Sequence, residues 1–170
     1  MSTQAMPDGL PAGAKWSKTP SLAITMSTLV EKITAPDVHP KVIEDCLQVI
    51  ETEVASKKGL SGAAVKAGYK VIKAIKPGMI KEAVTKLLPE FAEALEPMYD
   101  KAGRDGDAFS KYLIGHQDEA ADALLGVTDR KAHNAKNQTL KKTYDRLRGG
   151  AKTHVSAAVP NLARTLGRYA

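Results

Sequence analysis

Histidine and carboxylate side chains stand at metal-ligand spacing at two places in this chain of 170 residues. His116 precedes Glu119 by three positions and Asp129 precedes His133 by four, so each pair would share one face of a helix. A two-metal centre in a helical bundle needs a Glu-x-x-His element from each of two helices, and the sequence contains none. We therefore predict no metal site, and we expect His116 to be a hydrogen-bonded histidine at the edge of an apolar stripe.

The single cysteine, Cys46, excludes an internal disulfide and a zinc site built from several cysteines. It lies among Ile43, Leu47 and Ile50, where a free cysteine packs as a small hydrophobic side chain. The sequence also contains no phosphate-binding glycine loop, no G-x-S-x-G motif and no dinucleotide fingerprint. We predict neither a catalytic residue nor a cofactor, and an enzyme is the less favoured class of function.

Positive charge is concentrated near the C-terminus. The chain has 25 lysines and arginines against 19 acidic residues, a net charge of +6. Residues 130–170 carry ten of these cations and one acid, Asp145. Such a segment is typical of proteins that bind the phosphates of nucleic acid or anionic lipid. The candidate polyanion-binding residues in it are Lys141, Lys142, Arg146, Arg148 and Lys152.

The same cations also have a purely structural interpretation. They can lie on the solvated faces of amphipathic helices, or pair with the acidic residues of 82–100 within the fold or between subunits. Tyr144 and Tyr169, the nearby aromatic groups that could stack on bases, fall on the apolar side of their helices and are expected in the core. No helix-turn-helix or RNA-binding aromatic motif accompanies the charge.

A second candidate polyanion-binding group consists of Lys66, Lys70 and Lys73, which follow one another at helical spacing. The other side of this segment is small and apolar, including Ala67 and Gly68, so we expect it to pack closely against a neighbouring helix. A basic amphipathic helix can also lie on an anionic membrane. This one lacks bulky apolar anchors, so peripheral membrane contact is less favoured.

Apolar residues recur every three or four positions from residue 20 onward, which predicts helices and no strands. Pro89 and Pro97 fall inside one of these helices and predict kinks there. Ser61 and Asp107 are the expected N-terminal caps of two others. The predicted helices span 21–34, 38–58, 62–76, 79–102 and 107–132, followed by two or three short helices that break at Gly149-Gly150 and at Pro160.

The expected architecture is all-α, a single compact bundle of six to eight amphipathic helices formed by residues 20–170. Residues 1–19 contain several prolines and glycines without apolar periodicity, which predicts a flexible N-terminal arm. Trp16 is expected to dock this arm on the bundle. The first residues include Asp8 and no apolar block, so they do not resemble a signal peptide, and we expect a cytoplasmic protein.

The run from Gly59 to Ile80, GLSGAAVKAGYKVIKAIKPGMI, resembles an uncharacterised actinobacterial all-helical family of unknown function. The resemblance implies a helical fold and a bacterial cytosol. It implies no functional residues.

These observations favour a non-enzymatic helical protein that acts through protein–protein contacts, either with another protein or as a homo-oligomer, for which a homodimer is the favoured state. The alternative is a nucleic-acid-binding protein that uses the basic C-terminal segment together with Lys66, Lys70 and Lys73. A peripheral binder of anionic lipid, or of an apolar ligand within the bundle, is the third hypothesis.

Overall fold

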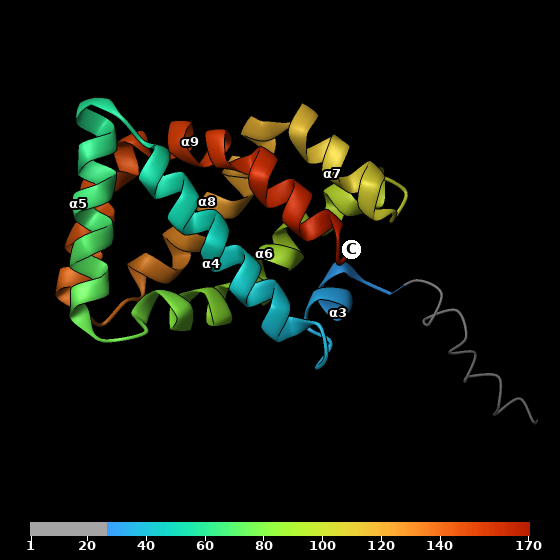
Figure 1. The fold of residues 1–170 in the computed structure, drawn as a ribbon, viewed down its shortest axis with the longest axis horizontal. Helices are drawn as coiled ribbons and strands as arrows, with labels where there is room; N and C mark the ends of the chain where they lie inside the picture. Colours follow the sequence, from blue (N-terminus) through green and yellow to red (C-terminus); the bar gives the residue numbers. More distant parts are fainter. Residues whose placement is uncertain (1–26) are drawn as a thin grey trace, which may run out of the picture.

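The computed structural model describes residues 27–170. Within that range the chain forms helices and turns and contains no strand, which confirms the all-α prediction. The arm predicted for residues 1–19, with Trp16, lies outside the described residues. The seven helices are α3 (Leu29–Ile33), α4 (His39–Ser56), α5 (Gly59–Ile75), α6 (Met79–Lys101), α7 (Gly106–Gly115), α8 (Gln117–His133) and α9 (Gln138–Gly167) (Figure 1).

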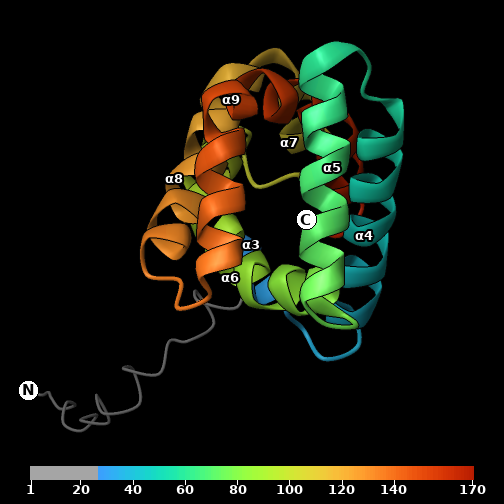
Figure 2. The same ribbon diagram turned by 90° about the vertical axis from the view of Figure 1, so that its left-hand side faces the viewer.

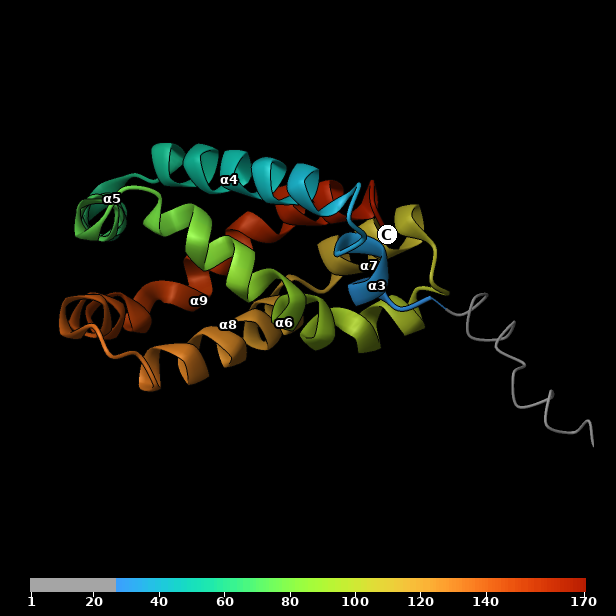
Figure 3. The same ribbon diagram turned by 90° about the horizontal axis from the view of Figure 1, so that it is seen from below.

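The two ends of the bundle are built differently. α5 stands across one end, whereas α3 and α7 lie at the other (Figures 1 and 3). α6 runs between α4 and α8 and contacts both (Figure 3). α9 contacts α4, α5, α7 and α8, so this helix connects the two ends.

The core is formed by the apolar faces that the sequence periodicity predicts. Tyr99 and Phe109 are its largest fully buried side chains. Leu124 is buried, and Leu47, Phe91 and Leu162 pack against the buried cluster, so all four point inward as expected. α5 is the one described helix that contributes no residue to this core.

The structure corrects several predicted helix starts. Among the described residues, the helix predicted for 21–34 is only α3, because Thr28 and Glu31 form a capping box through hydrogen bonds to each other's backbone N–H. α5 starts at Gly59, which has φ +74°, so Ser61 is inside the helix and does not cap it. Asp105 replaces Asp107 as the cap of α7, and its carboxylate accepts the Ala108 N–H at 2.9 Å.

The helix predicted for 107–132 is two helices separated by His116. This residue has φ −131° and ψ 47°, outside the helical region. Its Nδ1 donates to the Tyr112 carbonyl oxygen at 2.8 Å, and its ring stacks on the Tyr112 ring at 4.0 Å. Gly115, a poor helix former, precedes the break and is the sequence signal that could have located it.

α9 is one continuous helix, so the breaks predicted at Gly149-Gly150 and Pro160 are wrong. The helix bends instead, and its two halves run in different directions (Figure 2). Its first half packs on α5 through Leu147, whereas its second half reaches α4, where the His154 carbonyl accepts from Lys57. Gly149 and Gly150 lie between these two contacts. Glycine pairs are a common cause of helix bending.

Candidate interaction surface

α5 exposes most of its apolar side to solvent. Leu60 is 94% exposed and Val71 is 39% exposed, whereas only Gly62 and Gly68 of this helix are buried. The predicted close packing of the small-residue side is correct only in part. A Cβ atom added to Gly68 would lie 2.5 Å from Leu147 of α9, so the two helices do approach closely there. The remaining small residues of the predicted packing side are exposed, namely Ala63, Ala64, Ala67 and Ala74.

A small, mostly apolar groove of about 80 Å³ lies between α5 and α9. The two helices lie side by side there, with the first half of α9 next to α5 (Figure 2). We refer to this feature as the α5–α9 groove. Its lining includes Ala64, Ala67, Gly68 and Val71 from α5 and Arg146 and Leu147 from α9.

The lysines of α5 lie beyond its exposed apolar residues, on the side of the helix that faces away from α9. Gly68 marks the side of α5 that contacts α9. Successive residues of a helix are rotated by about 100°. Around the circumference of α5, Gly68 is therefore followed by Val71, then by Ala67, and then by Lys70.

Lys66 and Lys73 lie farther around the helix, toward α4. The Lys73 ammonium lies over the Tyr69 ring, and the Tyr69 hydroxyl donates to Glu51 of α4. The segment from 54 to 81 contains seven lysines and no acidic residue. This lysine side therefore has no acid on its own helix to neutralise it.

Arg146 borders the groove on the α9 side, where its side chain is exposed. Asp145 is the single acidic residue of α9. Around the helix it lies on one side of Arg146, and the groove-lining Leu147 lies on the other. Asp145 therefore faces away from the groove. Among the described residues, no ion pair involves Lys66, Lys70, Lys73, Lys141, Lys142 or Arg146.

Two of the predicted polyanion-binding residues form ion pairs with acids of α8. Arg148 makes a bidentate contact with Asp129 at 2.7 and 3.0 Å, and Lys152 lies 3.0 Å from Asp122. Elsewhere in the basic segment, Lys131 pairs with Glu90, as the structural interpretation anticipated for the acids of 82–100. Of the C-terminal candidates, Arg146 thus lines the groove, whereas Arg148 and Lys152 belong to ion pairs within the fold.

The interactions of Asp129 and Asp45 with neighbouring arginine and tyrosine side chains predict how the free energy of unfolding depends on pH. Hydrogen bonds from Arg148 and Tyr144 lower the pKa of Asp129 below its ordinary 3.8, and Tyr169 and Arg168 lower the pKa of Asp45 in the same way. Because the folded-state pKa is the lower one, this stabilisation is complete above the unfolded-state pKa and is lost as the pH falls through the folded-state value.

We expect the double variant Asp45→Asn/Asp129→Asn to be less stable than the wild type at pH 7. We also expect its stability to depend less steeply on pH in the acid range. Urea unfolding at a series of pH values measures both effects. An equally steep acid loss in the variant and the wild type would contradict this assignment.

Three of the four residues at metal-ligand spacing, His116, Glu119 and Asp129, have other partners. Asp129 accepts from Arg148 and Tyr144, and Glu119 pairs with Lys101 at 3.5 Å. No group of three or more His, Cys, Asp or Glu side chains that could hold a metal ion occurs within residues 27–170. Cys46 is buried as predicted, and desolvation raises the pKa of its thiol to about 11, so the thiol is protonated at neutral pH.

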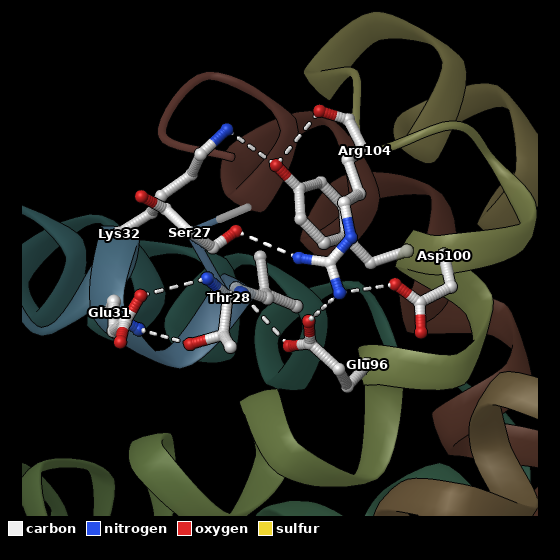
Figure 4. Close-up of polar contacts among 9 residues, drawn as sticks. Ser27, Thr28, Glu31, Lys32, Glu96, Asp100 and Arg104 are labelled. Carbon is white, nitrogen blue, oxygen red and sulfur yellow. Dashed lines mark hydrogen bonds and ion pairs between the residues drawn. The ribbon is translucent and has the colours of Figure 1, made fainter. Parts of the chain in front are cut away.

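A second polar cluster holds α3 against α6 and the turn after it (Figure 4). Glu96 accepts the Leu29 N–H at 2.8 Å and lies 3.2 Å from the Arg104 guanidinium. Arg104 also donates to the Ser27 carbonyl and pairs with Asp100. These groups bind one another, so we assign the cluster a structural role, the attachment of α3.

Among known proteins, the chain is similar to one family. A family described as a family of unknown function, DUF6918, matches residues 29–170. The chain belongs to this family. No curated protein and no solved structure matches the chain.

The DUF6918 match begins at the first residue of α3 and covers all seven described helices. The α5–α9 groove therefore lies wholly within the part that defines the family. The match agrees with the unknown function that the sequence resemblance implied. Among the described helices, none is long and apolar enough to cross a membrane.

Proposed function

We propose that this protein is a non-catalytic helical module that binds another protein through the α5–α9 groove and the exposed side of α5. The observation that carries the proposal is the exposure of Leu60 and Val71 on a helix that contributes nothing to the core. A contiguous apolar surface with a polar rim is typical of a protein-binding site.

The shape of the surface also favours a macromolecular partner. The groove has a volume of only about 80 Å³. Small-molecule sites typically have volumes of roughly 300–1,000 Å³ and enclose most of the ligand. The exposed apolar residues extend from Leu60 to Ala74, nearly the whole length of α5. A partner that covers this length must itself be an extended element, such as a helix.

Site-specific photo-crosslinking in cells that make the protein tests this proposal. A photoreactive amino acid at position 60 should give a discrete crosslinked product, because this side chain points into solvent beside the groove. The same amino acid at Lys111, an exposed position of α7, is the matched control. We expect Ala67→Glu, which puts a bulky charge into the groove, to abolish the product from position 60.

Equal crosslinking from both positions, or a product that persists in Ala67→Glu, would contradict docking on this surface. Sedimentation velocity of the purified protein shows whether the partner is a second copy. Self-association stays a prediction, and a monomer at high concentration whose state does not respond to salt would eliminate it.

Nucleic-acid binding is the second candidate, because Lys66, Lys70, Lys142 and Arg146 have no acidic partner among the described residues. It requires retention on DNA or RNA at low ionic strength. The affinity would then fall by roughly one power of the salt concentration per phosphate neutralised. A protein that does not bind under these conditions is not a nucleic-acid-binding protein.

A further inference from the structure

We infer that the partner of the α5–α9 groove is an amphipathic helix of another protein that carries acidic residues on both sides of its apolar face. This inference rests on the proposed function and adds the chemistry of the partner. It follows from the small exposed side chains of α5 and from the cations on the two sides of its apolar stripe.

The floor of the groove suits a helix. Ala64 and Ala67 are exposed and have the smallest side chain that a helix position can carry apart from glycine, so a partner backbone can come close to α5. Val71 and Leu60 supply larger apolar contacts toward the two ends of the stripe. A helix that places apolar residues at i, i+3, i+4 and i+7 would bury them along this line.

The cations on the two sides of the apolar stripe favour a partner helix with acidic residues on both sides of its apolar face. Lys70 lies beyond the apolar stripe on one side, and Arg146 lines the other side. Neither has an ion-pair partner among the described residues, and 54–81 contain no acid. Carboxylates on both flanks of a docked helix would face cations, whereas basic flanks would face like charges.

The same charges disfavour a second copy of this chain as the occupant. If two molecules met α5 to α5, the lysine side of one would oppose the lysine side or Arg146 of the other. An anionic membrane is disfavoured by the side chains of the stripe, since four of its six exposed members are alanines. Interfacial helices anchor themselves with larger groups such as Trp, Phe and Leu.

A designed peptide provides the direct test. The probe is a fluorescent helical peptide of the length of α5, with leucines at i, i+3, i+4 and i+7 and glutamates on both flanks. Its matched control has every glutamate replaced by lysine. Fluorescence anisotropy with the full chain should show at least about tenfold tighter binding of the acidic peptide, equivalent to about 1.4 kcal/mol.

Paired charge reversals locate the contact. Lys70→Glu/Arg146→Glu changes one cation on each side of the apolar stripe and should weaken binding of the acidic peptide by about tenfold or more. Lys41→Glu/Lys111→Glu changes the net charge equally at exposed positions of α4 and α7 and should leave the affinity within about twofold.

Three results would overturn the inference. Equal affinity for both peptides would show that the flanking charge is not recognised, while docking on the apolar groove would stand. An equal loss in the two paired variants would show that only net charge matters. Binding to phosphatidylglycerol vesicles without binding to the acidic peptide would identify a membrane as the occupant.

Discussion

Replacing Tyr99 with alanine is expected to lower the free energy of unfolding by about 3–5 kcal/mol, the range seen when a buried aromatic ring is removed. The Tyr99 side chain is completely buried in the core. Its ring packs edge-on against Phe109, with the centroids 5.3 Å apart and the planes at 78°, a geometry that adds to the stabilisation by burial.

The hydroxyl group of Tyr99 also connects three parts of the fold. It donates to the Arg104 carbonyl oxygen at 3.0 Å and accepts from Lys32 of α3. The variant Tyr99→Phe keeps the ring and removes these bonds, so it should cost only about 1 kcal/mol. Urea unfolding followed by circular dichroism measures both variants. If Tyr99→Phe lost as much stability as Tyr99→Ala, the packing of the ring would not be the main contribution of this residue to stability.

Gly106→Ala is expected to destabilise the protein by about 1–3 kcal/mol, because α7 and α9 touch through their backbones at this position. A Cβ atom on Gly106 would lie 2.3 Å from the Gly167 carbonyl oxygen and 3.0 Å from that of Ala170. Both are backbone atoms, so the end of α9 would have to move away from α7.

Gly115→Ala is the matched control in the same helix. No atom lies within 4 Å of the Cβ position at Gly115, and its φ is not positive. Alanine there should be neutral or stabilise the helix by up to about 1 kcal/mol. Thermal or urea unfolding of the two variants gives the comparison, and similar values for both would contradict the close approach of α7 and α9.

The helices with a strong apolar stripe could be predicted from the sequence, because the apolar residues that recur every three or four positions are the ones that pack into the core. α4 and α6 are within two residues of their predicted bounds, and Pro89 and Pro97 sit inside α6 without interrupting it. The break at His116 was missed because the apolar spacing continues across it. The continuity of α9 was missed because two glycines lower helix propensity without forbidding a helix.

The candidate surface could be predicted only in part. Spacing alone placed Lys66, Lys70 and Lys73 on one side of a helix, but periodicity does not indicate whether an apolar side is covered by another helix. The exposure of Ala67 and Val71 depends on where α9 crosses α5. Likewise, Arg148 and Lys152 belong to ion pairs with α8 that form only when the two helices meet in the fold.

The apolar side of α5 is available to a partner only if the chain's own fold does not need it. Replacing either of two alanines with glutamate tests most directly whether the fold needs this side of α5. Ala67 is exposed beside the groove, whereas Ala163 of α9 is completely buried.

We expect Ala67→Glu to change the free energy of unfolding by no more than about 0.5 kcal/mol, as for an ordinary surface position. Ala163→Glu should cost several kcal/mol, since it puts a carboxylate into the core. A comparably large loss of stability in Ala67→Glu would show that this side of α5 is packed within the protein, and it would contradict a free docking surface.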